Sequence, residues 1–216
     1  MFFSPACKVL PRVPHRIPSL GAHLGGAFLL ATTSWALSPP TWSQTVRLNE
    51  PFVYESVVGK VHDFILKPNG NFLFYRADAR RAGVIELFTV RAVGGMPPFR
   101  ENLKFLPDRS VLDYQPTAIG SWIVFHADQD ENDVFELYSR RPGDSAPRQL
   151  NGQLVLGGDV MSFALSPDGT RVVYCADQDV DELFELYVAA IDGSGSPVKI
   201  SGTMVVGGDV RTFPAF

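Results

Sequence analysis

The sequence has little cysteine, little histidine and no excess of basic residues. Its 216 residues include two cysteines and four histidines, and 19 Lys and Arg stand against 23 Asp and Glu, a formal charge of −4. An acidic chain without a basic stripe offers nothing to a phosphate backbone, so we expect no nucleic-acid partner. Aromatic residues make up 12% and charged residues 19%, which favours a β-rich globular protein over a disordered one.

The first forty residues differ in character from the rest of the chain. They are rich in proline, carry Lys8, Arg12 and Arg16, and lead into an uncharged apolar run at residues 25–37 that contains a small-x-small pattern at 34–36. This layout predicts a signal peptide at residues 1–36, a linker at 37–44, and a periplasmic or secreted bacterial protein. A shorter signal behind a misassigned start codon is the alternative, and it predicts export as well. The run is too short to span a bilayer, so we expect no membrane span in the mature chain.

Removal of this leader would leave one cysteine, Cys175. A single cysteine cannot form an internal disulfide, so the exported protein must be stabilised by packing.

The rest of the chain repeats itself with a period of about fifty residues. Val61, Val111, Val160 and Val210 open successive units, and each unit contains a turn, an acidic loop, an apolar segment with one glutamate, and a polar segment. The turns end in Gly70, Gly120 and Gly169, where glycine supplies the positive φ that such a turn requires. A period of this length is typical of repeat architectures.

Four short strands per unit, with turn signals between them, predict an all-β fold made of β-propeller blades. The expected strands are 61–64, 72–77, 85–88 and 98–102, then 111–114, 122–127, 135–138 and 147–151, then 160–163, 172–176, 184–188 and 197–201. The domain is thus 45–216, with blades at 61–110, 111–159 and 160–209 and the first strand of a further blade at 210–216.

Both ends of this domain predict an incomplete ring. Residues 45–49 resemble the fourth strand of the later units, and in a closed ring they would complete the last blade. Propellers close with about four to eight blades, so three blades would expose unpaired edges. We therefore expect the N-terminal part of a longer propeller or a truncated reading frame, with self-association through the open ring edges as the alternative.

The third unit carries S-P-D-G-T-R-V-V-Y-C-A-D-Q-D at residues 166–179 and F-E-L-Y at 184–187. These residues resemble the TolB-like, WD40-like propeller repeat of exported bacterial proteins, closely in the second and third units. The first unit departs from the pattern, because Ala79 and Arg80 replace the Gln-Asp pair. The resemblance implies a protein-interaction platform in the cell envelope. Similar propellers cap the active sites of prolyl-oligopeptidase-type serine peptidases, so the alternative is the propeller portion of such a peptidase.

The acidic loops and the Gly-Gly-Asp links between units should lie at the same end of the blades. The predicted interaction face there consists of Asp128, Asp130, Asp159, Asp177, Asp179 and Asp209. Calcium is a possible ligand of such carboxylates, with Asp128, Asp130, Asp177, Asp179 and Asp181 as weak candidates, and no other cofactor is expected. An EF-hand is not matched, because Glu182 stands where that loop needs glycine. The favoured reading is that these aspartates accept hydrogen bonds from backbone amides in the turns.

No catalytic constellation accompanies the repeat, and we expect no enzyme. The chain lacks a G-x-S-x-G elbow. His126 shares its repeat position with Arg76 and Cys175, which predicts a tolerant blade-surface position, and Cys175 is expected to be a semi-buried packing thiol.

One glutamate recurs in each unit, at Glu86, Glu136 and Glu185. A paired-carboxylate hydrolase needs two carboxyl groups aimed at one cleft. A glutamate that recurs once per blade is instead expected to face solvent or to pair with a neighbouring blade.

Overall fold

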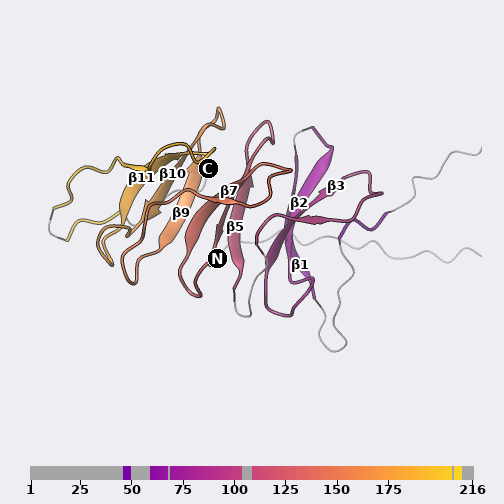
Figure 1. Ribbon diagram of the computed structural model, residues 1–216, viewed down its shortest axis with the longest axis horizontal. Helices are drawn as coiled ribbons and strands as arrows, with labels where there is room; N and C mark the ends of the chain where they lie inside the picture. The colour runs from indigo at the N-terminus through magenta and orange to yellow at the C-terminus, as the bar shows by residue number, and fades with distance from the viewer. Residues whose placement is uncertain (1–45, 50–58, 68, 104–108, 206, 211–216) are drawn as a thin grey trace, which may run out of the picture. The chain divides into compact units, whose positions relative to one another are not determined.

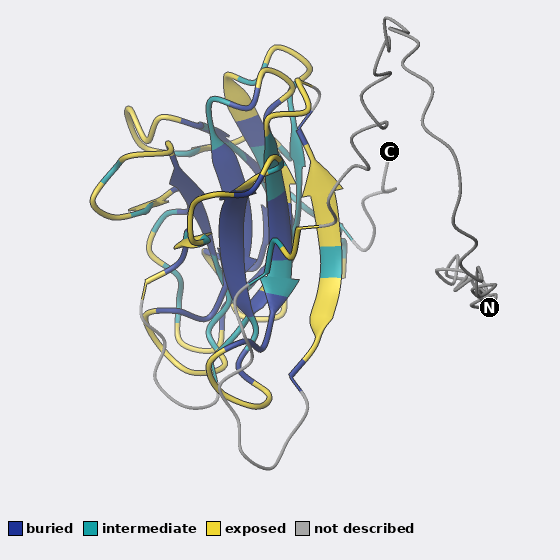
Figure 2. Cartoon of the chain, turned by 90° about the vertical axis from the view of Figure 1, so that its right-hand side faces the viewer, coloured by how far each residue is buried: buried dark blue, intermediate teal, exposed yellow. Residues whose placement is uncertain are grey.

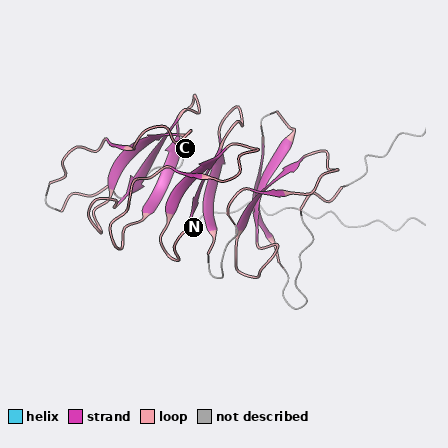
Figure 3. Cartoon of the chain, in the orientation of Figure 1, coloured by secondary structure: helices cyan, strands magenta, loops and turns pink. Residues whose placement is uncertain are grey.

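The computed structural model describes residues 46–49, 59–67, 69–103, 109–205 and 207–210. The predicted signal peptide and linker, and all but the first residue of the strand predicted at 210–216, lie outside the described residues. Within them the chain is all-β and contains no helix (Figure 3). It follows that no helix in this part of the chain could cross a membrane.

The described residues form twelve strands in three antiparallel sheets, each of four consecutive strands (Figure 1). The first sheet comprises β1 (Val61–Leu66), β2 (Phe72–Ala77), β3 (Glu86–Arg91) and β4 (Phe99–Arg100). The second comprises β5 (Val111–Pro116), β6 (Ile123–Ala127), β7 (Glu136–Arg140) and β8 (Arg148–Gln149). The third comprises β9 (Val160–Leu165), β10 (Arg171–Ala176), β11 (Glu185–Ala190) and β12 (Val198–Lys199). One sheet per repeat unit confirms the predicted all-β organisation, and the described residues include no closed ring.

The turn between the first two strands of each sheet has the predicted geometry. Gly70, Gly120 and Gly169 have φ values of +68°, +63° and +68°. Each glycine N–H donates to the carbonyl three residues earlier, at 2.8, 2.6 and 2.9 Å. The positive φ closes this turn and directs the second strand back along the first.

One aromatic pair recurs across the second and third strands of every sheet. The ring centroids of Tyr75 and Phe88 lie 5.1 Å apart, those of Phe125 and Tyr138 5.5 Å apart, and those of Tyr174 and Tyr187 5.3 Å apart, all stacked. The partners sit directly opposite each other in the strand register. Such cross-strand pairs stabilise the register of a sheet.

Apolar side chains join each sheet to the next. Between the first and second sheets, Phe74 and Leu87 pack with Tyr114, Ile123 and residues near them. Between the second and third sheets, the cluster includes the following buried residues: Val124, Leu137, Leu150, Val160, Val172, Tyr174 and Tyr187. In the middle sheet, β6 is therefore buried at every residue, and Figure 2 shows buried residues in dark blue. We call these two contacts the first and second junctions.

The first strand of the first sheet, β1, is more exposed than the first strand of the second sheet. Val61 and Phe64 of β1 are 39% and 68% exposed, whereas Val111 and Tyr114 of β5 are 0% and 4% exposed at the same repeat positions. Figure 2 shows β1 as an almost wholly exposed strand. In β5 these side chains pack on the preceding sheet, and in the described residues β1 has no preceding sheet.

Residues 46–49 form no strand, and the described residues include no last blade that they could complete. Leu48 nevertheless packs on the cluster of Tyr75, Ala77 and Phe88 in the first sheet. Leu150, at the equivalent repeat position, packs on the third sheet in the same manner. Residues 46–49 thus lie against the first sheet as the fourth strand of one sheet lies against the next sheet. The described residues include no preceding third strand with which they could pair.

The loop between the second and third strands contains a residue with left-handed backbone. Gly83 has φ +78°, but Asp133 and Glu182, at the same repeat position, have φ +58° and +62°. Residues with a Cβ rarely adopt this conformation. We expect Glu182→Gly to raise the free energy of unfolding by about 0.5–1 kcal/mol, because Glu182 is exposed and the strain is relieved.

Urea unfolding of the full chain measures this change, and Glu131→Gly is the matched control. Glu131 is exposed in the corresponding loop and has no positive φ. The control should lower stability because glycine adds entropy to the unfolded chain. Equal effects of the two substitutions would contradict the explanation from backbone strain.

Candidate functional site

The acidic loops begin with an aspartate that is buried in the second and third sheets. Asp128 and Asp177 are each 3% exposed. Asp177 Oδ1 accepts the N–H of Asp159 at 2.5 Å, and its Oδ2 accepts the N–H of Glu182 at 2.9 Å. Asp128 makes the equivalent two bonds at 2.6 and 3.4 Å. Each carboxylate therefore holds its own loop against the link that precedes its sheet.

The aspartate that ends each Gly-Gly-Asp link is also bound to backbone. Asp159 Oδ1 accepts the N–H of Phe135 at 2.7 Å, and Asp209 Oδ1 accepts that of Phe184 at 3.1 Å. Phe135 and Phe184 immediately precede β7 and β11. Each link is thus tied to the third strand of the sheet it leaves.

Several carboxylates approach one another where the second link meets the third acidic loop. Burial raises the pKa of Asp159, and the charges of Asp177, Asp133 and Asp181 raise it further, whereas the hydrogen bond from Phe135 opposes them. In the described part of the chain, no three His, Cys, Asp or Glu side chains are grouped so that they could hold a metal ion. Calcium binding at the five candidate aspartates therefore stays a prediction.

The predicted interaction face divides into buried and exposed residues. Asp130 and Asp179 are exposed, Asp159 and Asp209 are half-buried, and Asp128 and Asp177 lie too deep for a partner to reach. Asp130 Oδ2 accepts the hydroxyl of Tyr138 at 3.0 Å, and Asp179 pairs with Lys199 at 2.7 Å.

A cavity of about 550 Å³ lies beside the second acidic loop and the second link. Asp130 and Glu131 contribute carboxylates to it, and residues 154–156 contribute apolar side chains. Leu156 is 98% exposed. The N–H of Val155 donates to the carbonyl of Gln178 at 3.1 Å, so the link also touches the third acidic loop. The arrangement presents an exposed leucine beside carboxylates of the second acidic loop.

Two buried glutamines that the sequence analysis did not single out connect neighbouring sheets. Gln178 Oε1 accepts the N–H of Gly152 at 2.7 Å and the hydroxyl of Tyr174 at 2.9 Å. Gln129 Oε1 accepts the N–H of Leu103 at 3.3 Å. Both bonds reach the segment after the fourth strand of the preceding sheet. The sequence contains one indication of this role: both glutamines occupy the same repeat position, directly after the buried aspartates.

The recurring glutamates neither face solvent nor pair with a neighbouring sheet, so that prediction was wrong. Glu86 and Glu185 are each 3% exposed, and Glu136 is half-buried. They accept hydrogen bonds from Arg100 at 2.8 Å, Lys199 at 2.6 Å and Gln149 at 2.5 Å respectively. Each donor comes from the fourth strand of the same sheet, and this short strand carries few backbone bonds of its own.

Arg76, His126 and Cys175 share a repeat position at which each side chain donates a hydrogen bond to a backbone carbonyl. The prediction of a tolerant surface position was therefore wrong. Arg76 donates to the carbonyl of Val111 at 3.3 Å, and the Cys175 thiol to that of Val210 at 3.4 Å. The carbonyl of Val160 receives the hydrogen bond of His126, whose pKa burial lowers to about 4.

Cys175 is more deeply buried than predicted, at 2% exposure. Burial, with the charges of Asp209 and Asp177, raises the pKa of its thiol to about 11. A neutral thiol that bonds to backbone is a structural group and a poor nucleophile.

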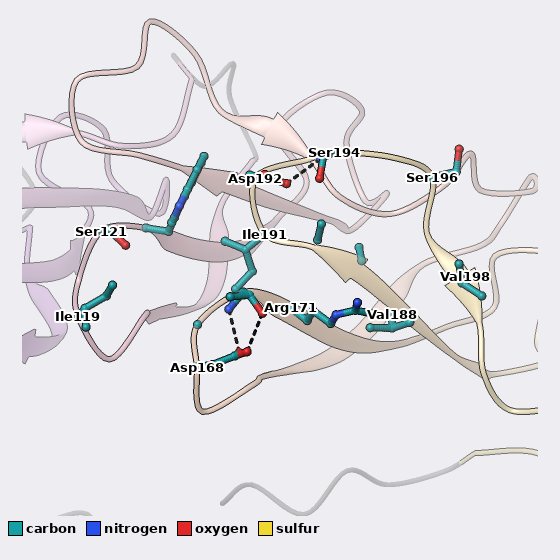
Figure 4. A pocket seen from close by; sticks show the side chains of 15 residues that line it. Ile119, Ser121, Asp168, Arg171, Val188, Ile191, Asp192, Ser194, Ser196 and Val198 are labelled. Carbon is teal, nitrogen blue, oxygen red and sulfur yellow. Dashed lines mark hydrogen bonds between the residues drawn. The ribbon is translucent and has the colours of Figure 1, made fainter.

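A second cavity, of about 620 Å³, lies at the opposite end of the sheets, between the turn before β6 and the third sheet (Figure 4). Its polar groups serve the local turns. Asp168 accepts the N–H of Thr170 at 3.1 Å, and Asp192 accepts that of Ser194 at 2.9 Å. The Ser166 side chain, and after it Thr170, lower the pKa of Asp168 by hydrogen bonding, and the side chain and backbone N–H of Ser194 lower the pKa of Asp192. Neither histidine of the described residues lines this cavity, so it holds no serine–histidine pair.

The chain matches no protein-family model, and it matches no curated protein.

Calcium provides a direct test of the acidic loops. We expect millimolar calcium to leave the midpoint of thermal unfolding unchanged, because Asp128 and Asp177 already bind backbone amides and Asp179 already binds Lys199. A ligand that binds the folded state alone must raise the midpoint. A rise with calcium that magnesium does not reproduce would show a site, and Asp130→Asn and Asp181→Asn would then test the two remaining candidates.

His126 should weaken the protein in acid. Its folded pKa of about 4 lies below the unfolded value of about 6.5, so protons bind the unfolded chain first as the pH falls through this window. Between pH 7 and 5 this should cost about 2 kcal/mol of unfolding free energy. His126→Cys, which copies the third unit, should remove most of that loss, whereas His62→Gln should retain it. Urea unfolding at both pH values measures this loss of unfolding free energy. An equal loss in wild type and in His126→Cys would refute the role of His126.

Proposed function

We propose that the three sheets are consecutive blades of a TolB-like β-propeller, and that the protein is an exported, non-catalytic binding module of the bacterial cell envelope. The blade assignment is supported by the apolar junctions and by the place of Leu48 on the first sheet. Val210 supports a further blade, since its N–H donates to Phe184 as those of Val111 and Val160 donate to Ile85 and Phe135. Export rests on the composition of the N-terminal residues alone.

The observation that carries the binding proposal is the end of the sheets that holds the acidic loops. Leu156, Val180 and Val205 are 98%, 53% and 79% exposed there. Val180 directly follows the exposed Asp179, and Leu156 lines one cavity together with Asp130 and Glu131. Exposed apolar side chains with a polar rim mark protein-interaction sites.

The side chains of this face favour a particular kind of partner surface. Apolar side chains gain free energy when a partner covers them, and carboxylates around them favour lysine or arginine on the partner. We therefore propose a partner protein that presents a basic and apolar segment. Such an interaction should weaken as salt screens the rim charges.

The described histidines and cysteine support a role without catalysis. His62 lies 3.5 Å from the carboxylate of Asp78, and His126 and Cys175 bond to backbone carbonyls of the next unit. Each group thus has a structural partner. The alternative is the propeller portion of a prolyl-oligopeptidase-type peptidase, in which the hydrolase would be encoded beyond Phe216. A downstream reading frame with a G-x-S-x-G elbow would favour that alternative, whereas further blades and a stop codon would exclude it.

Leu156→Ala should reduce capture of the partner at least fivefold, because an exposed leucine at the centre of an interface is worth about 1 kcal/mol or more. The measurement uses the immobilised full chain, envelope extract of the producing bacterium, and mass spectrometry at 50 and 300 mM salt. Asp130→Asn with Asp179→Asn should reduce capture at low salt and remove most of its salt dependence.

Ile119→Ala is the matched control, since Ile119 is 79% exposed at the opposite end of the sheets. It should leave capture unchanged. Equal loss from Leu156→Ala and Ile119→Ala, or capture that neither reduces, would refute the proposed face.

A further inference from the structure

A third cavity lies at the end of the first junction away from the acidic loops. It measures about 420 Å³, within the roughly 300–1,000 Å³ of small-molecule sites. Its apolar walls come from Phe72, Val90, Met96, Pro97, Phe99 and Pro142. Glu101 also belongs to the lining. This lining is more apolar than those of the two cavities described above, and Glu101 is its one acidic residue.

Glu101 breaks the repeat at this point. Leu150 and Ile200 hold its position in the second and third units. Arg140 likewise stands where the first and third units have Val90 and Ala189. The first junction thus carries a charged pair where the repeat has apolar side chains, and burial of such a pair has a large desolvation cost.

The Glu101 carboxylate is incompletely paired. Glu101 is 1% exposed, and its Oε1 accepts the hydroxyl of Thr89. Oε2 accepts no hydrogen bond from the described residues, and Arg140 Nε lies 3.7 Å from it. The other Arg140 nitrogens donate to the backbone carbonyls of Glu101, at 2.6 Å, and Asp144, at 2.7 Å. A buried acceptor without a donor costs about 1–3 kcal/mol, so architecture alone does not account for it.

We propose that this cavity binds a neutral aromatic group that donates one N–H or O–H to the Glu101 carboxylate, as an indole or a phenol does. The rings of Phe72 and Phe99 and the side chains of Met96 and Pro97 match an aromatic body. The donor would satisfy the acceptor that the junction leaves open.

The charges around the cavity favour a neutral ligand over a cation. Arg140 lies 4.7 Å from the centroid of the Phe99 ring, and Lys67 lies 5.1 Å from that of Phe72. Arg91 also lines the cavity. Arg140 and Lys67 thus act on the one carboxylate and Arg91 adds a third cation to the cavity, so a ligand ammonium group would meet net repulsion. Burial raises the pKa of Glu101, and Thr89, Arg140 and Lys67 oppose this rise. A hydrogen-bond donor on the ligand would lower the pKa of Glu101 further.

Isothermal titration of the full chain with indole and benzofuran tests the proposal. The two molecules have nearly the same shape, but benzofuran lacks the N–H. Indole should bind about tenfold more tightly, as expected for a hydrogen bond to a charged acceptor. Tryptamine, which adds an ammonium group, should bind more weakly than indole. Equal affinities for indole and benzofuran, or stronger binding of tryptamine, would overturn the proposal.

Two variants assign the preference to Glu101. Glu101→Leu places the residue type of the second unit in the cavity, and should bring the indole-to-benzofuran ratio to about one while both still bind. Glu101→Gln retains an acceptor and should leave an intermediate ratio. Asp168→Asn, which removes a carboxylate from another cavity, should keep the wild-type ratio. A wild-type ratio in Glu101→Leu would overturn the assignment, and the comparison of ligands on wild type stands if that variant fails to fold.

Discussion

From the second repeat unit onward, the valine that opens the unit is the point on which the rest of the structure depends. Its N–H donates to the residue before the third strand of the preceding sheet, as Val160 does to Phe135 at 2.8 Å. Its carbonyl accepts from the second strand of that sheet, as Val111 does from Arg76 at 3.3 Å. Both backbone groups are thus bound before the new sheet begins, so every sheet starts at the same place on its predecessor. The apolar layer stabilises the junction, and these directional bonds set its register.

This constraint explains why the acidic residues recur. A link that leaves one sheet and opens the next exposes backbone N–H groups in a region without strand partners, and aspartate is the short acceptor that satisfies them. Asp177 binds the link before its sheet, while Asp159 binds the sheet that the link leaves. The carboxylates are close together because the loops they hold are close together. Their mutual repulsion is a consequence of that architecture and is no sign of a ligand.

The repeat period, the turns and the four strands per unit were predictable from the sequence because they depend on local chemistry. Glycine at Gly120 and alternating apolar residues act within a few positions. The roles of Gln178, Glu185 and His126 were not predictable, because each depends on a partner in another strand or another sheet. Their shared repeat positions were visible, but position alone does not say whether a side chain turns to solvent or to a backbone carbonyl. Three different residue types at one position, Arg76, His126 and Cys175, suggested tolerance, and the common property was a donor hydrogen.

Residues that every unit shares are needed by every unit, so a function specific to this protein should be sought where the units differ. The second link differs from the loops beside it by an exposed leucine, Leu156. The first junction differs from the second by Glu101 and Arg140, which replace apolar side chains at a cost in desolvation. Leu156 is too exposed to contribute to the packing of the sheets. Arg140 does bond to the first sheet, but Leu150 and Ala189 serve the equivalent positions of the second junction with no charge to bury. An exception within a repeat that carries such a cost calls for a reason outside the repeat, and the binding that we propose at these two places would be one.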